Sequence, residues 1–276
     1  MMDTIVQALV MGIMQGLTEF LPISSSGHLI ILPSLLGWRD PFIDSLAFSV
    51  VLHIGTLAAL VSYFWRDWLV LVPAGLGLVR DRSTRGDRHR RLALDIAIAT
   101  VPAVIAGLLL NDWIEANVRQ PGLVALMLVI GAAILWLADR WGSKLLRIEG
   151  LGGPRALLIG VAQAFALIPG ISRSGISISA GLFVGLSRAD AARFSFLMAT
   201  PIIAGAGLFE LRKLAGGGLA TGDHLVPIVV GLLAAAIAGF LAIHVLLRYL
   251  RTNSMAVFVV YRLGLAALVV VSLLAR

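Results

Sequence analysis

Two short polar clusters interrupt an otherwise apolar sequence, and both contain residue types that bind or transfer phosphate. The first is QGLTEFLPISSSGH at residues 15–28, and the second is PGISRSG at residues 169–175. Gln15 and Glu19 lie four positions apart, so they share one face of a predicted helix. Pro22 ends that helix because proline disfavours helical backbone at the residue before it. The serines that follow are favoured N-cap residues, so a second helix is expected to begin there.

A helix that begins inside a membrane presents an anion site at its N-terminus, where free N–H groups and the positive end of the helix dipole point outward. In the second cluster Arg173 stands where the first cluster has a hydroxyl. Its planar guanidinium suits bidentate contact with phosphate, and an arginine at membrane depth is a functional candidate by default. Together with the hydroxyls, Glu19 and His28, these groups fit a phosphate or diphosphate better than a sugar or a metal alone. Gly27 allows a ligand or a facing backbone to approach closely.

The composition indicates an all-α polytopic membrane protein. Of the 276 residues, 59% are hydrophobic and 13% are charged, whereas a soluble domain carries about 25% charged residues. Six apolar segments are long enough to be predicted as membrane spans: 43–64, 92–110, 122–138, 194–211, 227–247 and 255–274. Two further regions, 4–37 and 156–186, are broken by Pro, Gly and Ser and are predicted to form re-entrant helix pairs. The stretch 66–79 is too short to span and is expected at the cytoplasmic interface.

The net charge of +7 is interpreted as membrane topology and does not indicate a nucleic-acid partner. Residues 80–91 contain six Arg and two Asp, so this loop is predicted to be cytoplasmic. Residues 139–155 and 248–251 are predicted inside for the same reason, and the more acidic 111–120 outside. Alternation then places both termini outside.

An internal repeat connects the two clusters. Residues 15–27 resemble 163–175, and residues 48–60 resemble 194–206. Each half reads as one re-entrant pair followed by three spans, and an odd number of spans inverts the second half relative to the first. We therefore predict one integral membrane domain over 1–276, built from inverted repeats at 1–140 and 153–276, with the polar turns converging near the midplane.

Structural roles compete with functional ones at several positions. Serines in membrane helices often cap or pack, and this interpretation is as good as a binding role for Ser26 or Ser174 taken alone. His53 lies inside a span beside Gly55 and is interpreted as a helix-packing residue. Arg262 lies within the last span, where it can either snorkel or pair. Residues 187–193 are interpreted as a turn capped by Ser187.

The same stretches resemble the undecaprenyl-diphosphatase family, the bacitracin-resistance type of membrane phosphatase, over nearly the whole chain. The family's first motif, an acidic residue or Gln followed four positions later by Glu, matches Gln15 and Glu19. Its Ser-rich turn with a following His matches Ser24, Ser25 and His28, and its second motif runs from Pro169 to Gly175. Gln15 replaces the second Glu of many members, and Ser177 stands where Thr is common, which keeps the hydroxyl.

The resemblance implies an enzyme that hydrolyses undecaprenyl diphosphate to undecaprenyl phosphate and inorganic phosphate, which recycles the lipid carrier for peptidoglycan synthesis. It implies a multi-pass protein of the bacterial cytoplasmic (inner) membrane with a site open to the periplasmic face. It also implies a divalent cation, Mg²⁺ or Ca²⁺, with Glu19 and Gln15 as its ligands. The expected partners are the polyprenyl diphosphate lipid and the bilayer. The oligomeric state stays open, and a homodimer is compatible with the sequence.

The mechanistic hypothesis is in-line attack by Ser25 Oγ on the terminal phosphorus, which gives a phosphoserine. Either His28 or Glu19 accepts the Ser25 proton, and Arg173 and the helix N-termini stabilise the transferring phosphoryl group. The remaining predicted phosphate contacts are Ser24, Ser26, Gly27, Ser172, Ser174, Gly175 and Ser177. The alternative mechanism uses a metal-activated water with Glu19 as base and no covalent step.

Two other functions compete with this reading. A polyprenyl-phosphate or anion transporter, or a flippase, would use the same midplane anion site, and the architecture alone does not exclude it. The phosphatidic-acid phosphatase type is suggested by SSGH at 25–28, but it requires a His seven residues after the Ser of a Ser-Arg pair. Ser172 leads to Ser179 and Ser187 leads to Phe194, so the sequence excludes that type.

Overall fold

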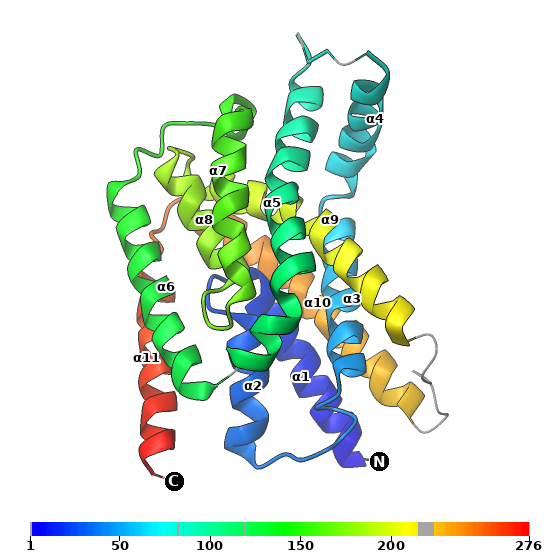
Figure 1. Ribbon diagram of the computed structural model, residues 1–276, viewed down its shortest axis with the longest axis vertical. Helices are drawn as coiled ribbons and strands as arrows, with labels where there is room; N and C mark the ends of the chain where they lie inside the picture. Colours follow the sequence, from blue (N-terminus) through cyan, green and yellow to red (C-terminus); the bar gives the residue numbers. More distant parts are fainter. Residues whose placement is uncertain (1, 82, 85, 119, 215–223, 276) are drawn as a thin grey trace.

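The protein is a bundle of α-helices in the part of the chain that the structure, a computed structural model, describes: residues 2–81, 83–84, 86–118, 120–214 and 224–275 (Figure 1). Within these residues no β-strand is present apart from an isolated bridge between Leu146 and Leu186. The helices are α1 (Met2–Phe20), α2 (Ser25–Leu36), α3 (Leu46–Tyr63), α4 (Trp65–Asp81), α5 (Arg88–Asn117), α6 (Pro121–Trp141), α7 (Gly153–Ala164), α8 (Arg173–Phe183), α9 (Arg188–Leu214), α10 (Leu225–Tyr249) and α11 (Ala256–Leu274), with short 3₁₀ turns at Ile148–Gly150 (η1) and Phe165–Leu167 (η2).

The six predicted spans are confirmed as helices long and apolar enough to cross a membrane, namely α3, α5, α6, α9, α10 and α11. Their bounds differ from the sequence estimate in two places. α5 continues to Asn117, so most of the loop predicted at 111–120 is helical, because no Pro or Gly occurs between Gly107 and Pro121. α9 begins at Arg188, so the turn predicted at 187–193 is wrong. The predicted cap is confirmed, since Ser187 Oγ accepts a hydrogen bond from Asp190 N at 3.1 Å.

The two broken regions each form a pair of helices joined by a short turn, as predicted. α1 ends at Phe20 and α2 begins at Ser25, while η2 ends at Leu167 and α8 begins at Arg173. Figure 1 shows the α1–α2 pair and the α7–α8 pair entering from opposite ends of the bundle, so that their turns meet between them. α3 and α9 also run in opposite directions there. This arrangement supports the inverted repeat, whose boundaries stay a prediction.

α4 is a helix of 17 residues over the stretch that was predicted to be too short to span. It lies beside the first part of α5 at one end of the molecule (Figure 1). Its expected place at the cytoplasmic interface stays a prediction. α1 begins and α11 ends at the other end of the molecule, which agrees with the prediction that both termini lie on one side of the membrane.

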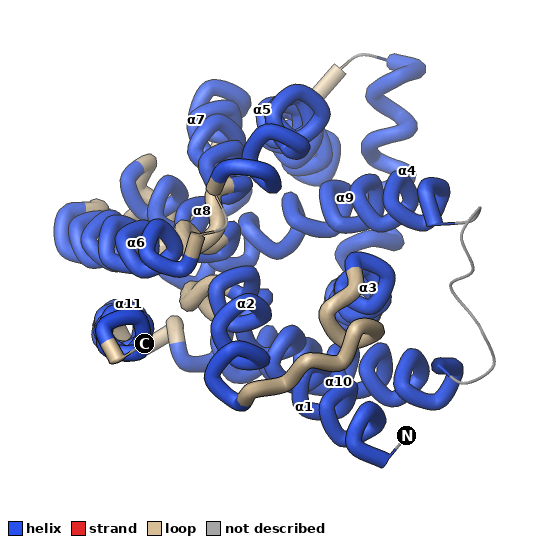
Figure 2. The backbone as a smooth tube through the Cα atoms, turned by 60° about the horizontal axis from the view of Figure 1, so that its bottom comes forward, coloured by secondary structure: helices blue, strands red, loops and turns tan. Residues whose placement is uncertain are grey.

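Small residues bring α1 against α10 and so place the carboxylate at the end of α1. A Cβ on Gly12 would lie 2.5 Å from Gly231 O, and one on Gly16 would lie 2.6 Å from Ala235 O. Backbones can approach this closely only when such side chains are absent, which is a common device in membrane helices. Figure 2 shows the two helices side by side, with the linker 37–45 crossing from α2 to α3 on the same face.

Aromatic packing fixes the last turn of α1. Phe20 is fully buried and meets Phe196 of α9 edge to face, with ring centroids 5.5 Å apart. Edge-to-face pairs of this kind stabilise a contact beyond the area that they bury. Apolar contacts alone therefore hold the end of α1, and with it the turn between α1 and α2, against both α10 and α9.

Candidate active site

The two turns that meet inside the bundle have the same local structure. Ser24 has φ 75° and accepts a hydrogen bond from Gly27 N at 3.4 Å. Ser172 has φ 73° and accepts one from Gly175 N at 3.1 Å. A positive φ is uncommon for a residue other than glycine and marks a backbone held by its surroundings. Among the candidate caps the structure therefore selects Ser24 in the first turn and Ser172 in the second.

Because the caps correspond, Ser25 and Arg173 occupy the same position in the two turns, the first residue of the following helix. Glu19 lies between them. Its Oε2 accepts a hydrogen bond from Ser25 Oγ at 2.5 Å, and its Oε1 accepts one from Arg173 Nη2 at 2.7 Å. Three of the four predicted catalytic residues thus form one hydrogen-bonded cluster.

His28, the fourth, faces away from this cluster. Its Nδ1 lies 2.7 Å from Ser24 O, and its Nε2 lies 2.8 Å from the hydroxyl of Tyr261 in α11. A carbonyl oxygen can only accept, so Nδ1 carries the proton and Nε2 of the neutral ring accepts from Tyr261. No hydrogen bond joins His28 to Ser25 among the contacts of the described residues. This geometry favours Glu19 over His28 as the acceptor of the Ser25 proton.

The predicted phosphate contacts divide into two groups. Ser26 and Ser172 line a cavity beside the cluster. The others are buried and support the turns. Ser24 is a cap, and Gly27 and Gly175 donate to the two caps. Ser174 Oγ donates to Leu21 O at 2.9 Å, while Ser177 Oγ lies 2.7 Å from Arg173 O and 2.6 Å from Ser195 Oγ. Contact of any of these residues with phosphate stays a prediction.

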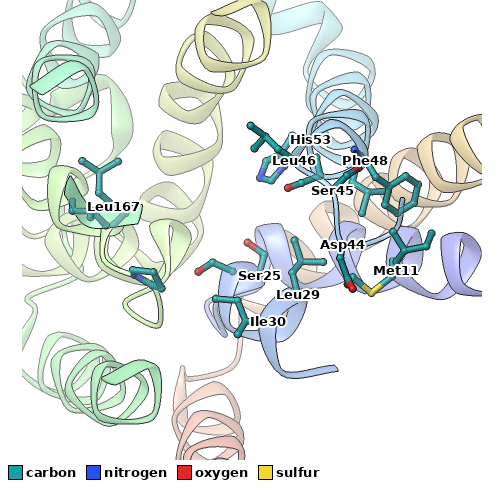
Figure 3. A pocket seen from close by; sticks show the side chains of 17 residues that line it. Met11, Ser25, Leu29, Ile30, Asp44, Ser45, Leu46, Phe48, His53 and Leu167 are labelled. Atoms are coloured by element: carbon teal, nitrogen blue, oxygen red, sulfur yellow. Dashed lines mark hydrogen bonds between the residues drawn. The ribbon is translucent and has the colours of Figure 1, made fainter. Parts of the chain in front are cut away.

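Two cavities meet at Ser25, the predicted nucleophile. The first, about 380 Å³, is shown in Figure 3 and extends from Ser25 towards Asp44 and Ser45 at the start of α3. The second, about 350 Å³, is lined by Glu19 and Arg173 and by a wall of α9 that is apolar except for Glu210. Ser25, Ser26 and His53 line both cavities. The cluster is therefore reached from two directions.

His53 lines the wall of both cavities, which its interpretation as a helix-packing residue did not predict. Its Nδ1 donates to Ser49 O at 2.8 Å, and its ring faces the cavity across from Ser25 (Figure 3). The close helix contact is made two residues later, where a Cβ on Gly55 would lie 2.5 Å from Leu232 O of α10. The signal available in the sequence was a polar side chain within an apolar span.

The donors around Glu19 can be compared with those that a divalent cation requires. No group of three or more His, Cys, Asp or Glu side chains suited to a metal occurs within the described residues. Gln15 donates from Nε2 to Glu19 Oε2 at 3.2 Å, which leaves its buried Oε1 without a hydrogen-bond partner. Mg²⁺ is commonly held by one or two carboxylates together with substrate phosphate oxygens. Glu19 fits such a shared site, and Gln15 can add its Oε1 only if its amide is turned over, because Nε2 is the atom that faces Glu19.

Two adjacent residues of α11 contact the turns, and the sequence analysis assigned neither of them a role in the site. Tyr261 holds His28, and their rings stack with centroids 5.6 Å apart. Arg262, which the sequence left undecided, does not snorkel; it is fully buried and donates to backbone carbonyls of both turns. A tyrosine and an arginine side by side within an apolar span were the available signal.

Comparison with known proteins identifies the family of this chain. A family model described as bacitracin resistance protein BacA matches residues 8–268. A curated undecaprenyl-diphosphatase of Thermomicrobium roseum is 48% identical over 276 residues, which cover 96% of this chain and 98% of the relative. Those of Moorella thermoacetica and Geobacter sulfurreducens are each 46% identical, with 97% and 99% of both chains covered, respectively. The chain therefore belongs to the family of bacitracin resistance protein BacA.

Proposed function

We propose that this multi-pass membrane protein is an undecaprenyl-diphosphatase, which hydrolyses undecaprenyl diphosphate to undecaprenyl phosphate and inorganic phosphate. The observation that carries the proposal is the Ser25–Glu19–Arg173 cluster at the junction of the two turns. A hydroxyl bonded to a carboxylate, with a guanidinium beside it, is the arrangement that phosphoryl transfer through an enzyme nucleophile needs. The full-length curated relatives bear the name of this activity.

In the first step Ser25 Oγ attacks the terminal phosphorus and passes its proton to Glu19 Oε2, which already accepts its hydrogen bond at 2.5 Å. The bond from that phosphorus to the bridging oxygen breaks, and undecaprenyl phosphate leaves with the electron pair. Arg173 holds the phosphoryl oxygens with the N–H groups that it does not direct at Glu19. The N-termini of α2 and α8 add the positive ends of two helix dipoles, which meet at the cluster from opposite directions, so most of the catalysis is electrostatic.

In the second step a water molecule attacks the phosphoserine. The bond between Ser25 Oγ and phosphorus breaks, and Glu19 returns its proton to that oxygen. The water loses its proton to the phosphate that forms, and inorganic phosphate leaves. Because Glu19 gives up the proton that it gained, the cluster returns to its starting state.

Glu19 and Gln15 would supply the protein oxygens for a divalent cation, Mg²⁺ or Ca²⁺, and substrate phosphate oxygens would be needed to complete its coordination. The buried Oε1 of Gln15 has no hydrogen-bond partner that would be lost if the amide turned over to face the cation. When bound, the cation neutralises charge on the diphosphate. Removal of the cation with a chelator is expected to lower the rate, and Gln15→Leu is expected to raise the cation concentration needed for half-maximal rate.

The two cavities suggest how the lipid and the phosphate are separated. Beyond Glu19 and Arg173, the second cavity runs along Ile202, Ala206 and Gly207 of α9, an apolar stretch suited to the isoprenoid chain, and Glu210 lines the same cavity one turn further along that helix. The first cavity reaches Asp44 and Ser45 of the linker before α3, which is predicted to lie at the outer face. We place the lipid chain in the second cavity and the exit of phosphate in the first.

The test is release of inorganic phosphate from undecaprenyl diphosphate by the purified protein in detergent. No compartments exist there, so release separates hydrolysis from transport. A quench of the reaction with terminally labelled substrate should trap label on Ser25, and Ser25→Ala should abolish both label and turnover. Normal turnover by Ser25→Ala would remove the covalent step, and lack of release by the wild-type protein would overturn the function.

A further inference from the structure

Arg262 carries a positive charge into the interior of the bundle at a place that the chemistry above does not use. It lies in the second helical turn of α11. Its side chain is fully buried and is the largest fully buried side chain among the described residues. A buried charge is costly and is normally neutralised by a carboxylate. Within the described residues no acidic side chain lies within salt-bridge distance of Arg262, in contrast to Arg173 with Glu19.

The partners of Arg262 are backbone carbonyls from three separate segments. Nη2 donates to Gly170 O at 2.7 Å and to Ile171 O at 3.0 Å in the second turn. Nη1 donates to Pro22 O at 3.4 Å in the first turn, and Nε donates to Leu128 O of α6 at 3.2 Å. The rigid fork of the guanidinium thus joins both turns, because its donors point in fixed directions from one plane.

The turn carbonyls that accept hydrogen bonds from Arg262 have no backbone donor in their own segments. Pro22, Gly170 and Ile171 lie between helices, where no helical N–H is available to their oxygens. A buried carbonyl without a partner costs free energy comparable to a lost hydrogen bond. The guanidinium therefore satisfies the irregular backbone that a broken helix leaves inside a membrane protein.

Two glycines leave the room for this side chain. A Cβ on Gly131 of α6 would lie 2.0 Å from Arg262 Nη2, and one on Gly175 would lie 2.8 Å from Nη1. Gly175 belongs to the first turn of α8 and donates to the cap Ser172. The guanidinium of Arg262 therefore lies beside the N-terminus of α8, the helix of which Arg173 is the first residue.

We infer that Arg262 is a positioning residue for the diphosphatase reaction. It fixes the first turn relative to the second, and so holds Ser25 and Glu19 in register with Arg173. Its uncompensated charge also adds to the positive potential of the α8 N-terminus. It touches neither substrate nor nucleophile. This inference rests on the proposed function, because its test measures the rate of the proposed reaction.

The experiment compares Arg262→Lys and Arg262→Gln with the wild-type protein in detergent, with the thermal midpoint and the amount of folded protein measured for each. Lys keeps the charge but not the fork, whereas Gln keeps a hydrogen-bond donor but not the charge. A misplacement of about 1 Å can cost about 100-fold in rate, so we expect kcat per folded molecule to fall by about 10- to 100-fold in both variants. KM should change by less than about threefold, because the groups that bind phosphate remain.

The matched control is Arg188→Gln, which removes another interhelical arginine. Arg188 Nε donates to Asp139 Oδ1 at 2.5 Å near the end of α6, away from the turns. The control should lose stability without losing kcat per folded molecule. A guanidinium salt added to Arg262→Ala should restore part of the rate, because the vacated space is shaped for it.

Three results would overturn the inference: kcat of folded Arg262→Gln within about twofold of wild type, an equal loss of kcat in Arg188→Gln, or a loss of activity that only follows the loss of folded protein. If Arg262→Gln and Arg262→Lys do not fold, the rescue of Arg262→Ala by guanidinium decides, and no rescue counts against the inference. Failure of the proposed function is distinguishable, because then the wild-type protein itself releases no phosphate.

Discussion

Arg173 donates to Glu19 at 2.7 Å although 154 positions of sequence separate the two residues. The side chains are 18% and 6% exposed, so this ion pair is largely shielded from solvent. The same carboxylate accepts a hydrogen bond from Ser25, so one residue connects the proposed nucleophile of the first turn to the guanidinium of the second. The two halves of the molecule therefore share one site, and neither half contains a complete one.

Glu19→Gln keeps the size of the side chain but removes its charge and its ability to take the Ser25 proton. We expect kcat to fall by about 100- to 10,000-fold, the usual contribution of a positioned proton acceptor. The measurement is phosphate release in detergent at saturating lipid. Glu149→Gln, the same change at an exposed position in η1, is the control and should leave kcat unchanged. Activity of Glu19→Gln close to wild type would exclude Glu19 as the base.

Arg173→Lys keeps the charge but replaces a planar fork with a single ammonium group. Because the guanidinium must hold Glu19 and phosphate oxygens together, we expect a loss of about 100- to 1,000-fold in kcat, comparable to removal of a donor to a developing oxyanion. Arg188→Lys changes another arginine that pairs with a carboxylate and should have little effect on kcat. Equal rates for wild type and Arg173→Lys would contradict bidentate use of the guanidinium.

Tyr261→Phe tests whether His28 acts on the substrate or on the turn. If His28 mainly holds the first turn through Ser24 O, loss of one neutral hydrogen bond of about 1 kcal/mol should lower kcat by no more than about tenfold. His28→Ala should cost more, because it removes both contacts of the ring. A result in which Tyr261→Phe raises the rate would show that the tyrosine restrains a histidine that takes the proton itself.

Gly207→Trp tests the path of the lipid chain. A Cβ at Gly207 meets no atom within 4 Å, so a larger side chain should project into the second cavity without disturbing α9. We expect a KM several-fold higher for undecaprenyl diphosphate and little change for a short water-soluble prenyl diphosphate. Leu208→Trp, at a neighbouring position that is 62% exposed, is the control. An equal effect on both substrates would place the chain elsewhere.

The sidedness of the site can be tested with single cysteines, because the natural chain has none. Asp44 is exposed at the first cavity, and Leu145, which is 88% exposed, lies in the linker after α6 that is predicted to be cytoplasmic. In intact cells a membrane-impermeant maleimide should label Asp44→Cys, while Leu145→Cys should react only after lysis. The reverse pattern would place the first cavity at the cytoplasmic face.

Much of this architecture follows from the sequence alone, because local patterns decide it. The apolar runs determined the six spans, since length and hydropathy are sufficient for that purpose. Pro22 and the Pro-Gly pair at 169–170 determined where helices break, and the serines after them determined where helices restart. Even the correspondence of Ser25 with Arg173 follows from the alignment of the two repeats.

The tertiary structure alone decided which of these groups touch. The sequence leaves open whether His28 or Glu19 accepts the Ser25 proton, because sequence spacing does not reveal that Tyr261, 233 positions away from His28, holds the histidine ring. The roles of His53 and Arg262 also depend on which helices face them. The physical reason is that hydrogen bonds between distant segments depend on how whole helices pack, and that packing is set by small residues and buried aromatic rings spread over the entire chain.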